Sequence, residues 1–151
     1  MKATAFSLTP KDYAKPLEVV GEKITVLASK EATQGYEVFL QDGVEGSGPP
    51  PHSHDWDESF YIIKGNVEIT SGGKAIAGKP GTFVHLPGGT VHSFRFGSGG
   101  GLMISMTSRG GNASGLFTDI DKEIPPGPPD IPKLIAIAAR NKVAIAPPPK
   151  Q

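Results

Sequence analysis

The chain of 151 residues has no cysteine, which excludes disulfide bonds, thiolate metal sites and a cysteine nucleophile. It has no net charge, because 15 Lys and Arg residues balance 15 Asp and Glu residues, so it offers no basic surface for a nucleic-acid backbone. No apolar run approaches the ~20 residues of a membrane span. The start contains Lys2 but no apolar stretch typical of a signal peptide. We therefore expect a cytoplasmic protein with no nucleic-acid or membrane partner.

The composition is rich in glycine and proline, with 20 and 15 residues respectively. These residues separate short runs of alternating apolar and polar residues, which is the pattern of a turn-rich β protein. Roughly nine such runs follow one another with no helix between them, which predicts an antiparallel sandwich or barrel rather than βαβ units. The predicted strands are 17–20, 23–29, 36–41, 59–63, 66–70, 82–86, 91–96, 102–108 and 143–145, with Gly21-Glu22 as the first hairpin turn.

Three segments are expected along the chain, and its length fits one domain of ordinary size. They are an N-terminal arm over 1–16, a barrel over 17–118, and a C-terminal extension over 119–151 that ends in a proline-rich tail. We expect one short helix, in the extension. Asp130 is a good N-cap, Pro132 suits a first turn, and an apolar stripe continues to a predicted end near Asn141.

Histidine carries the strongest functional signal, although the chain has only four. His52 and His54 are separated by one residue, so in a strand both imidazoles point to the same face. A short turn can return the carboxylate of Glu58 to that face, and His92 can supply a fourth group from a neighbouring strand. Neutral imidazole is the commonest protein ligand of transition metals, and a carboxylate adds negative charge. The pattern indicates a metal site.

Glycines and a proline surround these residues in two regular arrays. The arrays are Gly46-x5-His52-x-His54-x3-Glu58-x6-Gly65 and Gly81-x5-Pro87-x-Gly89-x2-His92. In both, the chain resembles the cupin superfamily, specifically the small single-domain conserved-barrel cupins. The resemblance is complete up to Phe96, where the family usually has an asparagine that is not a metal ligand.

The resemblance implies an all-β fold, a double-stranded β-helix or jelly roll, with its ligands inside the barrel. It also implies that His52, His54, Glu58 and His92 bind one divalent transition metal. The sequence does not distinguish among Fe, Mn, Ni, Cu and Zn, because availability in the cell overrides the order of affinities.

Strand alternation extends the prediction to a substrate pocket. If Glu58 faces inward, Phe60 and Ile62 share its face, and Phe94 and Phe96 share the face of His92. By a register taken from the family, the remaining candidates for the inner wall are Phe39, Gln41, Leu102, Ile104 and Met106. No Arg or Lys has inward parity near the metal, which favours a small, largely apolar or aromatic molecule that chelates the metal through oxygen atoms.

Other residues receive weaker predictions. His85 is either a proton shuttle near the metal or a hydrogen-bonded strand residue, and we favour the second. Asp55, Trp56 and Asp57 are expected at the rim of the barrel mouth. Outward-facing apolar residues, Tyr61 and Ile63, together with the C-terminal helix, favour a homodimer.

Three functions remain open at this point, and the sequence leaves undecided whether the chain is an enzyme. The first is a quercetinase-like metal-dependent dioxygenase in which Glu58 doubles as a general base. The second is a metal-dependent isomerase or lyase without redox chemistry. The third is a module that binds a small molecule without turnover, since one fold hosts many functions.

Overall fold

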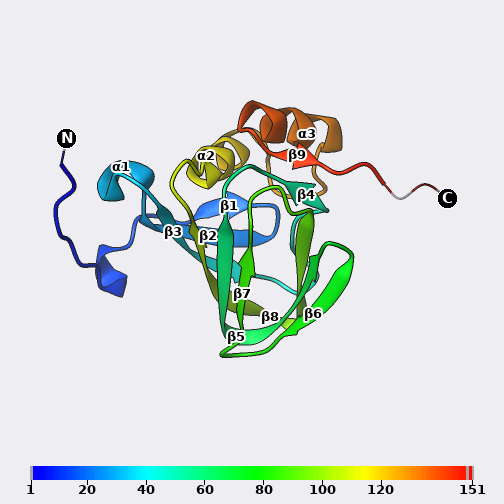
Figure 1. Cartoon of the computed structure of the whole chain (residues 1–151), viewed down its shortest axis with the longest axis horizontal. Coiled ribbons are helices and arrows are strands. Elements are labelled where there is room, and N and C mark those ends of the chain that lie inside the picture. Colours follow the sequence, from blue (N-terminus) through cyan, green and yellow to red (C-terminus); the bar gives the residue numbers. More distant parts are fainter. Residues whose placement is uncertain (1, 149, 151) are drawn as a thin grey trace.

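A curled antiparallel β-sheet forms the body of the protein in the computed structural model, which describes residues 2–148 and 150 (Figure 1). The prediction of an all-β jelly roll is confirmed. The strands among these residues are β1 (Leu17–Val19), β2 (Glu22–Ala28), β3 (Glu37–Gly43), β4 (His52–Ser53), β5 (Glu58–Ser71), β6 (Lys74–Gly78), β7 (Phe83–Leu86), β8 (His92–Thr107) and β9 (Ala144–Ile145). The helices are a 3-10 turn (Pro10–Asp12), α1 (Lys30–Thr33), α2 (Ala113–Glu123) and α3 (Ile131–Arg140).

Two long strands, β5 and β8, pair over nearly their whole lengths, and each contributes to both halves of the barrel (Figure 1). The sequence predicted each of them as two separate strands around a glycine turn. The glycines instead bend continuous strands, with Gly65 opposite Gly101. At φ +76°, a Cβ on Gly65 would lie 2.2 Å from the carbonyl oxygen of Gly100, so only glycine fits this bend.

The bend in β8 overturns part of the predicted inner wall. Between the pairs Val67↔Phe96 and Gly65↔Gly101, β5 has one residue and β8 has four, so the alternation of faces shifts at the bend. After it, the buried residues of β8 are Met103, Ser105 and Thr107. The prediction that Leu102, Ile104 and Met106 line the inner wall is therefore wrong, because these residues lie half-buried on the outer face.

The first hairpin turn is also one residue away from its predicted place. Val20 and Gly21 occupy the turn, with positive φ angles of 46° and 89°, which matches the right-handed twist of the flanking strands. Glu22 is therefore the first residue of β2 rather than a turn residue, and it shares the buried face of Ile24. This shift places a carboxyl group inside the barrel.

The chain after β8 holds the predicted helix, α3, and a longer one, α2, that was not predicted. The Asp130 carboxylate accepts a hydrogen bond from the Lys133 amide and caps α3, as expected. The additional helix, α2, packs on β1 and covers the open side of the sheet, with Phe117 edge-on to Phe39 at a centroid distance of 5.0 Å. The proposed division at residue 118 falls inside α2 and stays a prediction. Of the predicted tail, 149 and 151 lie outside the described residues, as does residue 1 of the arm.

The two larger apolar clusters fill most of the interior. The lower one lies between the strands of the barrel, and its larger members are Phe60, Ile62, Ile69, Phe94, Phe96 and Met103. The upper one joins β1, β2 and β3 to the helices, and its members include Val19, Ile24, Phe39, Ile120 and Ile137. Burial of such side chains stabilises a fold by about 1.5–3 kcal/mol each before entropy is counted.

Candidate metal centre

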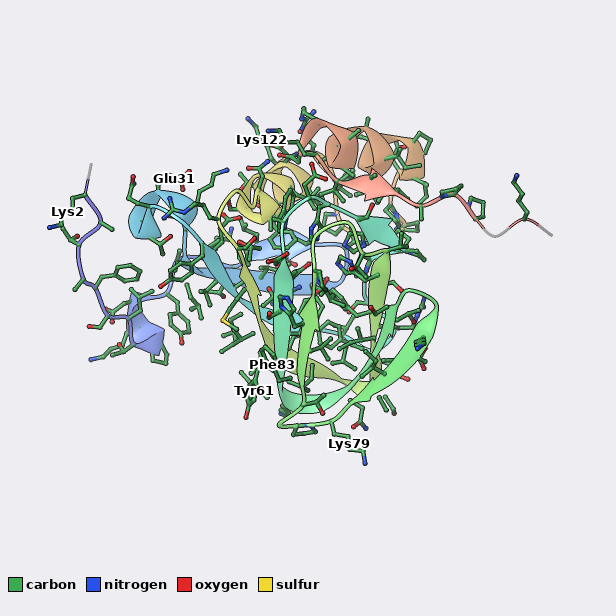
Figure 2. The ribbon with its side chains drawn as sticks, in the orientation of Figure 1. Lys2, Glu31, Tyr61, Lys79, Phe83 and Lys122 are labelled. Carbon is green, nitrogen blue, oxygen red and sulfur yellow. The ribbon has the colours of Figure 1, made fainter. Side chains whose placement is uncertain are left out.

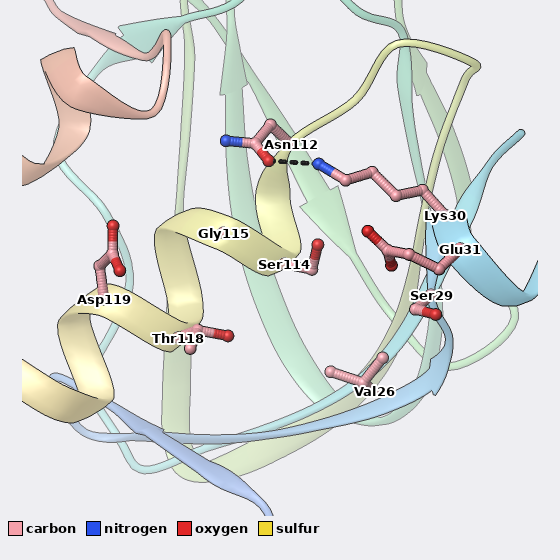
Figure 3. A pocket seen from close by; sticks show the side chains of 9 residues that line it. All are labelled: Val26, Ser29, Lys30, Glu31, Asn112, Ser114, Gly115, Thr118 and Asp119. Carbon is pink, nitrogen blue, oxygen red and sulfur yellow. Dashed lines mark hydrogen bonds between the residues drawn. The ribbon is translucent and has the colours of Figure 1, made fainter.

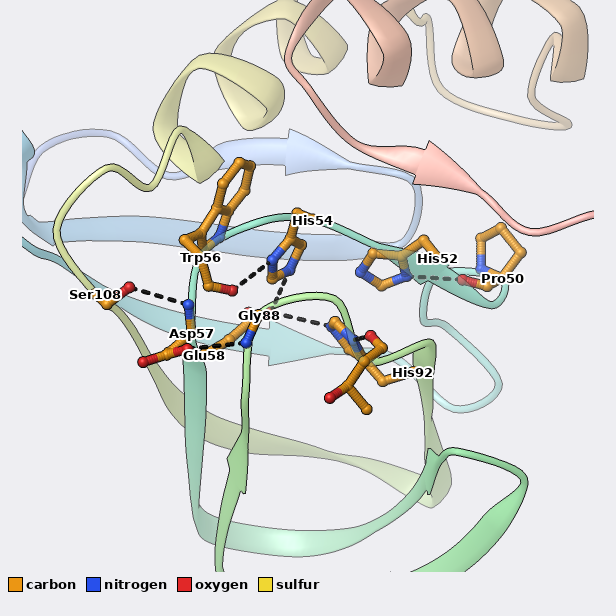
Figure 4. Close-up of polar contacts among 10 residues, drawn as sticks. Pro50, His52, His54, Trp56, Asp57, Glu58, Gly88, His92 and Ser108 are labelled. Atoms are coloured by element: carbon orange, nitrogen blue, oxygen red, sulfur yellow. Dashed lines mark hydrogen bonds and ion pairs between the residues drawn. The ribbon is translucent and has the colours of Figure 1, made fainter.

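Three strands that start at one end of the barrel bring the four predicted ligands together. His52 begins β4, Glu58 begins β5 and His92 begins β8, while His54 lies in the loop after β4. His52 pairs directly with His92 across β4 and β8. One ligand atom from each of the four residues lies within 4.8 Å of all the others, and the residues are only 2–9% exposed (Figure 4). The expected convergence is present.

Each histidine ring is oriented by a backbone carbonyl two residues away in the chain. A carbonyl oxygen only accepts hydrogen bonds, so Nδ1 carries the proton in all three rings and the Nε2 lone pair is left for a ligand. The acceptors are Pro50 O for His52 at 2.9 Å, Trp56 O for His54 at 2.9 Å and Thr90 O for His92 at 2.8 Å. Such anchoring of the second ring nitrogen is characteristic of metal-binding histidines.

The site places acceptor atoms close to one another. Glu58 Oε2 lies 3.0 Å from His54 Nε2 and 3.2 Å from His92 Nε2. Since Nδ1 holds the proton of a neutral ring, these contacts repel unless a positive charge lies between the atoms. A divalent cation supplies that charge for the whole cluster at once, so the residues present fit a transition-metal ion.

The pKa values follow from the same geometry. Burial opposes ionisation of Glu58, but its contacts with His54 and His92, which stabilise the carboxylate when a positive charge lies between the atoms, outweigh burial and lower the pKa of Glu58 to about 2. Burial, helped by the neighbouring His92, lowers the pKa of His52 to about 4. Burial also disfavours the charged form of His92, but its contacts with Glu58 prevail and raise its pKa. Near pH 7 the carboxylate is therefore ionised and His52 is neutral, as metal ligands must be.

The C-terminal segment closes over this end of the barrel. Trp56 lies there as expected, but it is buried beneath the segment, packed with Ala138 and Val143. Its ring stacks on His54 at 4.2 Å with an interplanar angle of 6°. The backbone of β9 pairs with β4, and His52 lies opposite Ile145 (Figure 4). The sequence did not reveal this cover, because the contacting residues are far apart in the chain.

Most predicted pocket residues lie inside the molecule, but they do not all lie together. Gln41, Phe60, Ile62 and Phe94 are buried on the inner face. Phe39 is also buried, but it belongs to the upper cluster against α2. Ile104 and Met106 lie on the outer face, as described above.

Glu22 is the interior residue that the sequence analysis missed. It is 5% exposed, and Gln41 Nε2 donates a hydrogen bond of 2.9 Å to its Oε1. Burial raises the pKa of Glu22 to about 8, and the charge of Glu58 adds to this effect against the hydrogen bond from Gln41. The signal was present, because Glu22 alternates in phase with Ile24 and Val26.

His85 lies outside the cluster. It is exposed on β7, and its Nδ1 lies 3.0 Å from Ser59 Oγ, which agrees with the favoured interpretation of a hydrogen-bonded strand residue. Tyr61 is exposed on the outer face opposite Phe83, so the apolar surface that motivated a homodimer is present (Figure 2). The homodimer itself stays a prediction.

Two surface pockets lie apart from the histidines. One, of about 390 Å³, lies between α1 and α2, where Lys30 donates a hydrogen bond to Asn112, and Glu31 and Asp119 add negative charge (Figure 3). The other, of about 400 Å³, lies between the N-terminal arm and Tyr36. Neither contains a histidine or a residue of the cluster. Among the described residues, no helix is long and apolar enough to cross a membrane.

Comparison with known proteins gives one family. The family model for the cupin domain matches residues 39–105. Quercetin 2,3-dioxygenase of Bacillus subtilis (strain 168) is 33% identical over 75 residues, which cover 48% of this chain and only 22% of that protein.

Solved structures share the barrel. KdgF from Halomonas sp. matches with a TM-score of 0.64 and 20% identity, over 74% of this chain and 99% of that one. The polyketide cyclase RemF from Streptomyces resistomycificus matches with a TM-score of 0.60 and 17% identity, over 70% and 80% of the two chains. At these identities the structures show the fold alone. Residues 39–105 therefore match a cupin domain, and they lie within a jelly-roll barrel that the chain shares with these structures.

Proposed function

We propose that this protein binds one divalent transition metal and catalyses the oxygenative cleavage of a small, largely apolar or aromatic molecule that chelates the metal through oxygen atoms. The observation that carries the proposal is the buried cluster of three Nε2 atoms and one carboxylate, with each ring fixed by a backbone carbonyl. The segment shared with quercetin 2,3-dioxygenase supports dioxygenase chemistry.

The four residues of the cluster have distinct roles in this proposal. His52, His54 and His92 hold the metal, and Glu58 adds the negative charge that a divalent ion requires. A metal bound here supplies Lewis acidity and open positions for oxygen ligands, and in its redox-active forms it activates dioxygen. Glu58 lies within the cluster, and its carboxylate can accept the proton that a chelating hydroxyl group releases when it detaches from the metal.

The interior offers an anionic ligand no cationic side chain. Among the described residues, the buried polar and charged side chains include no Lys or Arg, and three of them, Glu22, Glu37 and Glu58, are acids. A phosphate or a sugar acid would find no side-chain cation to pair with its charge, and the metal would be its one positive partner. Phe60, Ile62 and Phe94 offer an apolar wall near the cluster.

Metal content tests the site. Wild-type protein purified without chelator should contain about one metal ion per chain, and His54→Ala should lose most of it. His85→Ala is the matched control, because it removes a histidine outside the cluster and should keep the metal. Full metal stoichiometry in His54→Ala would contradict the ligand assignment.

Oxygen consumption tests the chemistry. Protein loaded with Fe(II), Ni(II) or Mn(II) should consume dioxygen with at least one member of a panel of flavonols, diketones and catechols, with both oxygen atoms appearing in the product. Equal turnover under argon would instead identify a metal-dependent isomerase or lyase. Tight binding without turnover in every metal form would identify a binding module.

A further inference from the structure

Four polar residues form a diagonal line across the inner face of the sheet: Glu22 on β2, Gln41 on β3, Ser105 on β8 and Glu58 on β5. The strand register sets this line. Gln41 lies opposite Ile24, two residues beyond Glu22, and Ser105 lies opposite Phe39, two residues before Gln41. Ser105 also lies opposite Phe60, two residues beyond Glu58. We call these four residues the polar stripe.

Each step of the polar stripe joins diagonal neighbours on adjacent strands, which lie about 7–8 Å apart, within reach of long side chains. Gln41 and Glu22 are one such pair, and the Gln41 side chain donates a hydrogen bond to the Glu22 carboxyl group. The charge of Glu58 helps to raise the pKa of Glu22, which agrees with both acids facing the same interior. The polar stripe therefore leads from the metal cluster into the barrel.

The polar stripe separates the two apolar clusters. Phe60, Ile62 and Met103 belong to the lower cluster on one side of it. Ile24 and Phe39 belong to the upper cluster on the other side. A line of polar groups between two apolar clusters is costly unless each group has a partner.

Two atoms of the polar stripe have no partner within the described part of the chain. They are Gln41 Oε1 and Ser105 Oγ, in side chains that are 2% and 0% exposed. The bond from Gln41 Nε2 to Glu22 orients the amide and leaves its oxygen free to accept. Ser105 can donate or accept. Leaving a buried polar atom unpaired costs more free energy than one hydrogen bond contributes. We therefore expect a polar group from outside the protein to bind these two atoms.

Charge defines the class of that group. No Lys or Arg is buried among the described residues, so away from the metal an anionic group would find no cationic partner. Burial raises the pKa of Glu22 to about 8, which keeps its carboxyl group protonated near pH 7. The far end of the polar stripe is then neutral and offers both donors and acceptors.

We infer that Gln41 and Ser105 bind a hydroxyl group of a neutral ligand whose other end chelates the metal held at Glu58. This inference rests on the proposed function and narrows its substrate class to chelators with a hydroxyl group remote from the chelating oxygens. Glu22 is a positioning residue, because it acts through Gln41.

A matched pair of small chelators tests the inference. Kojic acid and allomaltol chelate metals through the same ketone and hydroxyl oxygens, and they differ only by a hydroxymethyl group in place of a methyl group. Calorimetric titration of the Zn(II)-loaded full chain at pH 7 measures both affinities without requiring turnover. We expect wild-type protein to prefer kojic acid by about five- to tenfold, the value of one net hydrogen bond.

Variants assign that preference to the polar stripe. Gln41→Leu and Ser105→Ala should each reduce the preference to about twofold or less, while affinity for allomaltol stays within about twofold of wild type. Ser105→Ala leaves the Gln41–Glu22 bond in place, so it is informative even if Gln41→Leu folds poorly. Ser93→Ala, on the outer face of β8, is the control and should keep the wild-type preference.

The outcomes separate this inference from the proposed function. Equal affinities for the two ligands in wild-type protein, or an unchanged preference in both variants, would overturn the role of the polar stripe and leave metal chelation intact. If neither chelator bound the zinc-loaded protein, chelation itself would be contradicted, and the inference would fall with it.

Discussion

Replacing Glu22 with glutamine should make the metal-free protein more stable at neutral pH. The carboxyl group is buried, and burial raises its pKa from 4.5 to about 8 in the folded protein. Glutamine has nearly the same shape, and its amide oxygen can still accept the hydrogen bond from Gln41. The substitution therefore removes an ionisable group and little else.

The magnitude follows from proton linkage. Between pH 4.5 and about 8 the unfolded chain releases the Glu22 proton while the folded chain keeps it. The folded state binds more protons there, so its stability is full below pH 4.5 and falls by about 1.4 kcal/mol per pH unit as the pH rises. By pH 7 the accumulated loss is about 3 kcal/mol, and Glu22→Gln avoids it.

Urea unfolding followed by circular dichroism, from pH 4 to pH 8, measures the effect. The free energies of unfolding of wild type and Glu22→Gln should differ little at pH 4, and the variant should gain steadily up to pH 7. Glu68→Gln is the control, because it removes an exposed carboxylate from β5 of the same barrel. A difference that does not change with pH, or a variant that loses relative stability as the pH rises, would refute the placement of Glu22 in the interior.

Three further predictions concern the metal centre and the barrel. Burial opposes protonation of His92, but contacts with Glu58 prevail and raise its pKa, so protons should compete with metal at higher pH than for an ordinary histidine. Zinc affinity measured by chelator competition should fall by about tenfold per pH unit below that pKa. Trp56→Leu should weaken zinc affinity by about tenfold in the same assay, because it removes the ring stacked on His54. Gly43→Ala should lower the free energy of unfolding by about 1–3 kcal/mol in urea titrations, because its Cβ would lie 2.1 Å from the Phe96 ring; unchanged stability would contradict the packing.

Much of the fold could be predicted because its signals are local. Alternation along single strands identified the inward positions of Phe60, Ile62 and Phe94. The Asp130 cap and the apolar stripe after it identified α3. The helix α2 was missed although Leu116, Phe117, Ile120 and Ile124 have helical spacing, since nearby glycines favoured a turn.

The predicted side-chain directions were wrong where the alternation of inward and outward residues along a strand is interrupted. The bend at 97–100 shifts the faces of β8, which moved Ile104 and Met106 to the outside. The turn at Val20-Gly21 places Glu22 inside, and a β-branched residue at positive φ is unusual enough to escape prediction. A shift of one residue reverses every following side chain, so a single misplaced turn changes a whole wall.

The sequence by itself determined which groups are available to the site: three imidazoles and one carboxylate at spacings that let two rings share a strand face, in a chain without cysteine or net charge. Only the tertiary structure decided that His92 meets His52, that Trp56 lies beneath α3 and β9, and that Glu22, Gln41 and Ser105 align with Glu58. The physical reason is that side-chain direction is a local property of a strand. Proximity between strands depends instead on register, which bends and turns set over the whole barrel.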